Sequence, residues 1–290
     1  MRIATRHKLA IARLLSRIAI AAGGHTPSPH QVTAVRRGIR WELNLREGID
    51  LSLYLFGCFE WRTARLIRQL LAPGDVALDI GANIGAHTLP MAQVVGDTGF
   101  VIAFEPTDYG CNRIIRACTL NPQLAVRITL RKAFLSSEHG GYVPHAILAR
   151  WPLDREEELQ SSHCGVPEVA GHLRCSTVDD QLAREPLARI KLIKLDVDGH
   201  EPHVILGARR TLTQWRPDII MEWAPEARTS PADRSAEGDA LKLLHELGYV
   251  AGEVGSRRVG PVLDTLKRAS LPLGTSANMH LRLADRRPSR

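Results

Sequence analysis

The sequence lacks paired-cysteine motifs and any long apolar run, and both absences exclude large classes of protein. Its 290 residues hold five cysteines, an odd number with no C-x-x-C pair, which argues against a disulfide framework and a zinc knuckle. No stretch of about 18 apolar residues occurs, so no segment is predicted to span a membrane. With a hydrophobic fraction of 44%, the chain can nevertheless bury a large core. A folded protein of a reduced, cytoplasmic compartment is therefore expected.

Acidic residues are missing from the first 41 positions, and these positions carry the excess positive charge of the chain. The formal net charge is +7, and eight cations precede the first acid, Glu42. These cations are Arg2, Arg6, Lys8, Arg13, Arg17, Arg36, Arg37 and Arg40. The rest of the chain is close to neutral, whereas nucleic-acid binding needs cations clustered over the folded domain. Nucleic acid is therefore not an expected partner.

Residues 1–22 predict a basic amphipathic helix. Its two opposite faces would hold Arg2, Arg6, Arg13 and Arg17 on one side and Ile11, Leu14, Leu15 and Ile18 on the other. Such a helix either packs on its own domain or frays, or it contacts an anionic membrane surface or a partner protein. The Gly, Pro and Ser residues of 23–30 indicate a linker, so 1–30 form a separate N-terminal segment.

The remaining chain is expected to form an α/β domain. Residues 31–75 are predicted to supply strands and a helix that pack on the core, with a hairpin of strands at 39–45 and 51–57. In 76–290, buried strands alternate with helical patterns, which predicts a mostly parallel sheet with helices on both faces. An insertion at 138–175 interrupts this rhythm, and segments of that length often form lids or substrate loops.

The segment VALDIGANIGAHT, residues 76–88, predicts a buried strand, a glycine turn and a helix start. A dinucleotide fingerprint requires G-x-G-x-x-G, but the second and third of these positions hold Asn83 and Ala86. The side chain of Asn83 hinders close approach of a pyrophosphate. Asp79, at the end of the strand, would repel phosphate and attract a cation. The turn therefore favours a positively charged ligand.

Glu105 ends the next strand, where a doubly wound sheet places an acid against a ribose diol. A ribose, a positive charge and no phosphate together describe S-adenosylmethionine. Two alternatives stay open at this point. Gly81 and Gly85 could serve only a tight turn, with Glu105 on the surface, or the chain could be an NAD-dependent oxidoreductase.

Several of these motifs resemble those of one family, the FkbM family of class I S-adenosylmethionine-dependent methyltransferases. The similar segments are LDIGANIGAHT, VIAFEPT, IKLIKLDVDGHEPHVILGA and RPDIIMEW, and the resemblance covers about residues 60–283. It implies a Rossmann-like, seven-stranded, mostly parallel sheet with an antiparallel last strand. It also implies O-methyl transfer to a hydroxyl of a small molecule or of a sugar or glycan.

The resemblance also implies roles for individual residues. Glu105 would bind the ribose, and Asp196 would face the sulfonium end of S-adenosylmethionine. The residues implied to line its methionine portion are Asp79, Gly81, Ala82, Asn83 and Gly85. One position departs from the family pattern D-x-E-G-x-E, because Asp198 replaces the middle Glu and is one methylene shorter.

The run DVDGHE, residues 196–201, supplies the candidate catalytic groups. Asp196 is expected to orient the acceptor or the methionine ammonium group, and His200 or Glu201 to take the proton of the hydroxyl. His200 and Glu201 could instead serve only the start of a helix. Glu222, at the end of the next strand, either lines the same opening or forms a structural ion pair.

Two further interpretations stay open. Asp196 and Asp198 offer the oxygen ligands that Mg²⁺ accepts, so methyl transfer could be metal-assisted, although the leading interpretation includes no metal. The chain could also bind S-adenosylmethionine without catalysis. The sequence names neither the methyl acceptor nor an oligomeric state.

Overall fold

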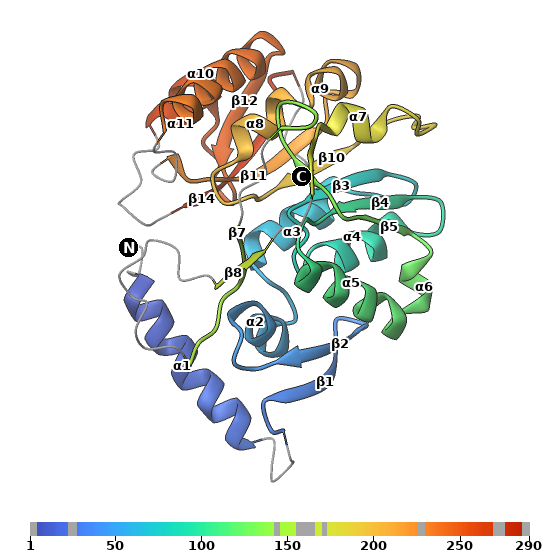
Figure 1. The fold of residues 1–290 in the computed structure, drawn as a ribbon, viewed down its shortest axis with the longest axis vertical. Coiled ribbons are helices and arrows are strands. Elements are labelled where there is room, and N and C mark those ends of the chain that lie inside the picture. Colours follow the sequence, from blue (N-terminus) through green and yellow to red (C-terminus); the bar gives the residue numbers. More distant parts are fainter. Residues whose placement is uncertain are drawn as a thin grey trace.

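A central mixed β-sheet organises the molecule (Figure 1). The computed structural model describes residues 5–22, 28–141, 146–154, 166–169, 173–225, 230–268 and 276–285. Within them, eight strands form the central sheet in the order β13-β12-β14-β11-β10-β3-β4-β5. Their bounds are β3 Val76–Ile80, β4 Phe100–Phe104, β5 Ile128–Arg131, β10 Leu192–Leu195, β11 Asp218–Trp223, β12 Tyr249–Glu253, β13 Gly260–Pro261 and β14 Ala277–Leu283.

The strand directions agree with the expected class I methyltransferase topology. Strands β11, β10, β3, β4 and β5 run parallel, and β14 is antiparallel to both β11 and β12. The predicted seven strands are present, and the two-residue β13 adds an eighth at the edge beside β12. The carboxyl ends of β3, β4, β10 and β11 therefore meet at one edge of the sheet, where such folds bind ligands.

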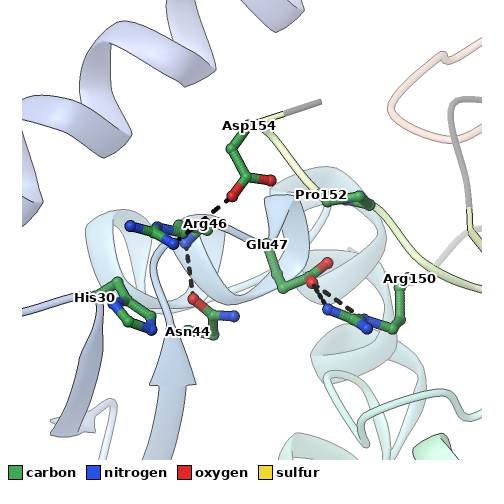
Figure 2. A pocket seen from close by; sticks show the side chains of 7 residues that line it. All are labelled: His30, Asn44, Arg46, Glu47, Arg150, Pro152 and Asp154. Carbon is green, nitrogen blue, oxygen red and sulfur yellow. Dashed lines mark hydrogen bonds and ion pairs between the residues drawn. The ribbon is translucent and has the colours of Figure 1, made fainter. Parts of the chain in front are cut away.

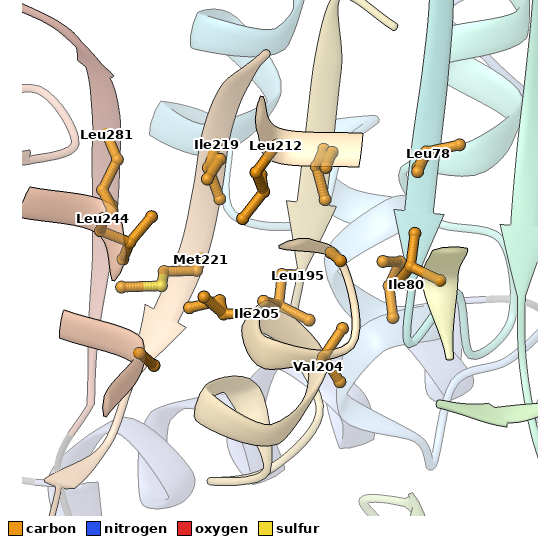
Figure 3. Packing of buried hydrophobic residues seen from close by; sticks show 14 of the residues in the cluster. Leu78, Ile80, Leu195, Val204, Ile205, Leu212, Ile219, Met221, Leu244 and Leu281 are labelled. Atoms are coloured by element: carbon orange, nitrogen blue, oxygen red, sulfur yellow. The ribbon is translucent and has the colours of Figure 1, made fainter. Parts of the chain in front are cut away.

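Helices cover both faces of the sheet. Successive residues of a strand point to opposite faces, and here the residues on both faces are apolar and buried. Leu78 and Ile80 of β3 pack in one cluster with Val204 and Leu212, as Figure 3 shows from close by, whereas Ala77 packs in a second cluster on the other face. The first face is covered by α7 Val178–Leu182, α8 Glu201–Leu206, α9 Arg209–Trp215, α10 Pro231–Glu246 and α11 Val262–Arg268. The second is covered by α3 Trp61–Leu70, α4 Thr88–Val95, α5 Asp108–Leu120 and α6 Pro122–Ala125.

The predicted hairpin at 39–57 is half wrong. Strand β2 (Ile39–Asn44) forms as expected, but it pairs with β1 (Gln31–Arg36), and the second predicted strand is helix α2 (Gly48–Phe56). A run as short as Leu-Ser-Leu-Tyr-Leu is compatible with the two-residue period of a strand and with a helix. Tertiary packing decides between these two structures. In α2, Leu51 and Leu53 are buried in two different clusters, on two sides of the helix. Gly57, with a positive φ of 69°, terminates α2.

The insertion connects the glycine turn with the N-terminal part. Its described strands, β7 (Ala146–Arg150) and β8 (Val166–Val169), form an antiparallel pair. Arg150 pairs with the buried Glu47, as Figure 2 shows, and the backbone N–H of Leu153 donates to the carbonyl of Arg46. Beside the insertion, the short β6 (Phe134–Leu135) pairs with β9 (Cys175–Ser176).

Helix α1 (Thr5–Ala22) confirms the predicted N-terminal helix, and Ile11, Leu14 and Ile18 of its apolar face are exposed. It packs through Ala19, partly buried neighbours and Ser16, whose hydroxyl donates to the carbonyl of Leu45 at 2.7 Å. Arg13 donates to the carbonyl of Leu153 at 2.8 Å. In the described part of the chain, neither α1 nor another helix has the length and apolar character needed to cross a membrane.

Candidate active site

Most of the predicted site residues meet at the carboxyl ends of the parallel strands. Asp79 lies on β3, Glu105 follows β4, and Asp196 and Asp198 follow β10. Glu222 lies near the end of β11. These strands are neighbours in the sheet, so the topology alone places five carboxyl groups along one edge.

Packing requires glycine at two positions of the turn after β3. Gly81 and Gly85 have φ angles of 78° and 82°, which favour glycine. A Cβ at Gly81 would lie 1.8 Å from the carbonyl oxygen of Asp196, and one at Gly85 would lie 2.8 Å from Leu89. Ala82 is buried, and its N–H donates to the carbonyl of Phe104 at 3.0 Å. Both glycines are therefore required by the fold itself.

Asn83 adopts the left-handed conformation that a glycine would have in a dinucleotide fingerprint, with φ of 49°. Its backbone N–H donates to Glu105 at 2.8 Å, and its amide nitrogen donates to the carbonyl of Ala149 at 3.1 Å. The turn is thereby bonded to the neighbouring strand end and to strand β7 of the insertion. The insertion covers the turn at this point.

Glu105 is 4% exposed, and its carboxylate is held by three donors of the chain. These are the backbone N–H groups of Asn83 and Thr107 and the hydroxyl of Thr107. Burial outweighs these hydrogen bonds and raises the pKa of Glu105 above its ordinary value. A carboxylate offers about four acceptor positions, so about one remains for a ribose hydroxyl.

Lys194 is a site residue that sequence reasoning missed. Its ammonium group is buried between two carboxylates, 3.6 Å from Asp79 and 3.3 Å from Asp196, and it donates to the carbonyl of Gly81 at 3.0 Å. Burial alone would lower the pKa of Lys194, but the carboxylates of Asp196, Asp79 and Glu60 outweigh it and raise that pKa. The sequence did contain a signal for this residue, namely a lysine inside the apolar strand IKLIKL. A lysine that is buried is almost always paired with an acid, so this position predicts a buried ion pair.

Asp198 and Glu222 hold protons near neutral pH. Burial, with the neighbouring charges of Asp196 and Glu201, raises the pKa of Asp198 to about 8. Burial and the charge of Asp196 raise the pKa of Glu222 to about 10, although Ser276 donates a hydrogen bond to it. Both groups therefore sit where an added positive charge would favour their ionised forms.

Glu201 and His200, the two groups expected to take the proton, are engaged elsewhere. Glu201 is fully buried, and its Oε1 accepts from the backbone N–H groups of Val197 and Gly199, both at 3.1 Å. It thus supports the turn in which Asp198 adopts a positive φ of 53°.

The His200 ring lies within 3.1 Å of the Ser136 hydroxyl and stacks on His203 at 4.4 Å. Burial and the neighbouring His203 lower the pKa of His200 to about 4. The His200 ring therefore faces Ser136 and His203.

Unpartnered buried atoms gather around the same turn. Among the residues that the structure describes, six buried side-chain nitrogen or oxygen atoms have no hydrogen-bond partner. Five of them belong to Glu60, Asp79, Asn83 and His87. Buried polar atoms are nearly always satisfied, so this concentration is typical of a ligand site. The carboxylate of Asp79 and the amide oxygen of Asn83 suit the ammonium group and the sulfonium of S-adenosylmethionine.

A metal site is not formed by these groups. Within the described ranges, no three His, Cys, Asp or Glu side chains converge so that they could hold a metal ion. Asp196 is instead paired with Lys194.

Comparisons with known proteins identify the family. The family model described as "Methyltransferase FkbM domain" matches residues 79–251, more than half of the chain. A search of curated proteins found no match. The chain belongs to the FkbM methyltransferase family, and it is an S-adenosylmethionine-dependent methyltransferase.

A comparison with solved structures found several similar chains. An FkbM methyltransferase from Methylobacillus flagellatus has 15% identity and a TM-score of 0.44, over 74% of this chain and 47% of that one. A precorrin-6y C5,15-methyltransferase from Geobacter metallireducens has 13% identity and a TM-score of 0.43, over 78% and 88%. An S-adenosylmethionine-dependent O-methyltransferase from Thermotoga maritima has 14% identity and a TM-score of 0.40, over 82% and 72%.

Proposed function

We propose that this methyltransferase transfers a methyl group to a hydroxyl oxygen of an uncharged small molecule or glycan. The observation that carries the proposal is the ring of carboxyl groups around a single buried lysine at the carboxyl edge of the sheet. Glu60, Asp79 and Asp196 surround Lys194, and Asp198 and Glu222 stand beside them. Such a site attracts a cation and repels phosphate, so acceptors that carry phosphate groups are disfavoured.

We infer that the turn holds the methionine part of the cofactor, through Asp79, Gly81, Ala82, Asn83 and Gly85. Glu105 accepts from the ribose, and Asp196 orients the ammonium group or the acceptor. Bound S-adenosylmethionine supplies a methyl group on a positively charged sulfur. The chain then has to hold the acceptor oxygen in line, exclude water and receive a proton. Glu201 contributes by fixing the turn of residues 197–199.

A panel of defined acceptors tests the proposal. The wild-type protein is incubated with S-adenosylmethionine and methyl α-D-glucopyranoside, methyl α-D-mannopyranoside or methyl α-L-rhamnopyranoside, and mass spectrometry follows S-adenosylhomocysteine and the methylated sugar. We expect a methyl ether from at least one neutral glycoside and slower turnover of glucose 6-phosphate. Turnover of amine or phosphorylated acceptors alone, or of no hydroxyl acceptor, would contradict the proposal.

A further inference from the structure

The side chains of His87 and Glu60 lie side by side at the site, with His87 buried and Glu60 half-buried. His87 directly precedes α4 and is 4% exposed, and neither of its ring nitrogens has a partner among the described residues. Glu60 directly precedes α3, and its Oε2 is likewise unpartnered among those residues. The His87 Nε2 and Glu60 Oε2 atoms lie 3.8 Å apart. This distance is too long for a hydrogen bond, but a hydroxyl group beside both atoms could bond to each.

The pair lies between the glycine turn and the ends of β11 and β14. The Glu60 carboxylate faces Lys194, which bonds to Gly81 of the turn, and Asn278 of β14. Asn278 pairs in register with Glu222 of β11. On another side, the ring of Phe59 lies 5.9 Å from the imidazole of His87. The pair is therefore enclosed by site residues and one apolar ring.

Glu60 carries a negative charge in this position. Burial by itself raises the pKa of its carboxyl group, but His87, Asn278 and Lys194 outweigh burial and hold that pKa below its ordinary value. A fixed carboxylate beside an imidazole stabilises the imidazolium ion when the ring gains a proton. The charged groups that face the ring are thus Glu60 and, beyond it, Lys194.

We propose that His87 is the catalytic residue that takes the proton of the acceptor hydroxyl and that Glu60 is its positioning residue. The assignment rests on the proposed O-methyl transfer. The acceptor oxygen forms a bond to the methyl carbon while the carbon–sulfur bond breaks and its electron pair stays on sulfur. The hydroxyl proton moves to a ring nitrogen of His87, and Glu60 stabilises the resulting charge. Asp198 and Glu222 already hold protons near neutral pH and suit this task less well.

Variants with matched controls test the assignment kinetically. His87→Gln is expected to lower kcat on the fastest neutral methyl glycoside about 10²- to 10⁴-fold, the usual contribution of a general base. Its Kd for S-adenosylmethionine, measured by calorimetry, should change less than about twofold. Glu60→Gln should lower kcat with KM unchanged, and Glu60→Asp should restore part of the loss. His245→Gln, on the exposed side of α10, is the matched control. A His87→Gln variant with more than half of the wild-type kcat would overturn the proposal.

A crystal structure of the wild-type complex with S-adenosylhomocysteine gives a readout that needs no acceptor. We expect a water molecule within hydrogen-bond distance of both His87 Nε2 and Glu60 Oε2, where the acceptor hydroxyl would lie. A direct hydrogen bond between the two side chains, with no water between them, would overturn the assignment. Methylation of amines alone by the wild type would instead refute O-methyl transfer and leave this structural result standing.

An independent observation concerns the outer face of α1. Ile11, Leu14 and Ile18 are 51%, 59% and 55% exposed, and they lie on one face because they are spaced three and four residues apart. Arg17 beside them is exposed as well. Figure 1 shows α1 along the outside of the molecule, next to the insertion and α2. This apolar row lies within the first 41 residues, which carry eight cations and no acidic residue.

We infer that this face of α1 docks on an anionic lipid bilayer. Aliphatic side chains enter the boundary between head groups and acyl chains, and the exposed Arg17 beside the row attracts the anionic head groups. The opposite face of α1 stays bound to the protein through Ser16 and Arg13. The contact of Arg13 with Leu153 joins α1 to the insertion segment whose Ala149 bonds to the glycine turn.

Vesicle sedimentation with the full chain tests the docking. Binding to phosphatidylcholine vesicles containing phosphatidylglycerol is expected, with weaker binding at higher salt and on pure phosphatidylcholine. The triple variant Ile11→Ser, Leu14→Ser, Ile18→Ser should bind more than about tenfold more weakly. Ile115→Ser, at a residue 56% exposed on α5, is the control. Equal binding of the triple variant, no binding of the wild type, or dimerisation lost in the triple variant would each overturn the inference.

Discussion

Binding of S-adenosylmethionine should become tighter with rising pH because of Asp198. Burial and its acidic neighbours raise the pKa of Asp198 to about 8. At pH 7 about nine-tenths of the molecules then carry a proton there, and at pH 9 about one-tenth do. A cationic ligand favours the ionised form, so binding at pH 7 has to release this proton, whereas binding at pH 9 does not. The affinity of the wild type relative to that of Asp198→Asn should therefore rise about tenfold from pH 7 to pH 9.

Calorimetric titrations of the wild type and of Asp198→Asn measure this effect. At pH 7, titrations in two buffers of different ionisation enthalpy should give a release of about 0.9 proton for the wild type beyond that of the variant. The cofactor's own amine titrates in both proteins alike, so the difference isolates Asp198. Asp97→Asn is the control variant. The Asp97 carboxylate is 87% exposed and lies just before the first residue of β4, at the edge of the sheet opposite to the site. The same pH dependence in the wild type and in Asp198→Asn would refute the reasoning.

Three further predictions concern single residues. Glu105→Gln should weaken S-adenosylmethionine binding about tenfold or more in calorimetry, because the ribose loses a charged acceptor worth about 1.5–3 kcal/mol; unchanged affinity would contradict the ribose assignment. Glu201→Gln should lower the free energy of unfolding by about 1–3 kcal/mol in urea titrations, since its carboxylate satisfies two N–H groups in a buried turn; an unaltered midpoint would argue against this role. His200→Asn should keep kcat within about threefold of the wild type, whereas a loss of a hundredfold would return the general-base role to this ring.

Much of the fold could be predicted because its strands are short buried runs between turn residues. Residues 76–80 and 192–195 are examples, and the order of their neighbours follows from the right-handed crossovers of α/β sheets. Helix α2 could not be predicted, since the apolar spacing of 51–57 fits a strand and a helix equally well and packing against β2 decides it.

The site was predictable only where its residues lie in one motif. Asp79 lies on a strand that the sequence pattern identifies, and Asn83 and Glu105 follow such strands. The pairing of His87 with Glu60 depends on how α3 meets the glycine turn, across 27 positions of sequence. The orientations of His200 and Glu201 depend on the left-handed conformation of Asp198. The Asp198-Gly199 pair indicates a turn, but it does not tell where the side chains after it point.

The central claim is that the methyl group of S-adenosylmethionine reaches a hydroxyl oxygen at this edge of the sheet. Carbon-13 NMR of the product formed from [methyl-¹³C]S-adenosylmethionine and the neutral glycosides tests it most directly, with Asp79→Asn as the inactive comparison. We expect a labelled methyl ether carbon on the sugar in the wild-type reaction. A label found only on nitrogen, or equal labelling by Asp79→Asn, would contradict it.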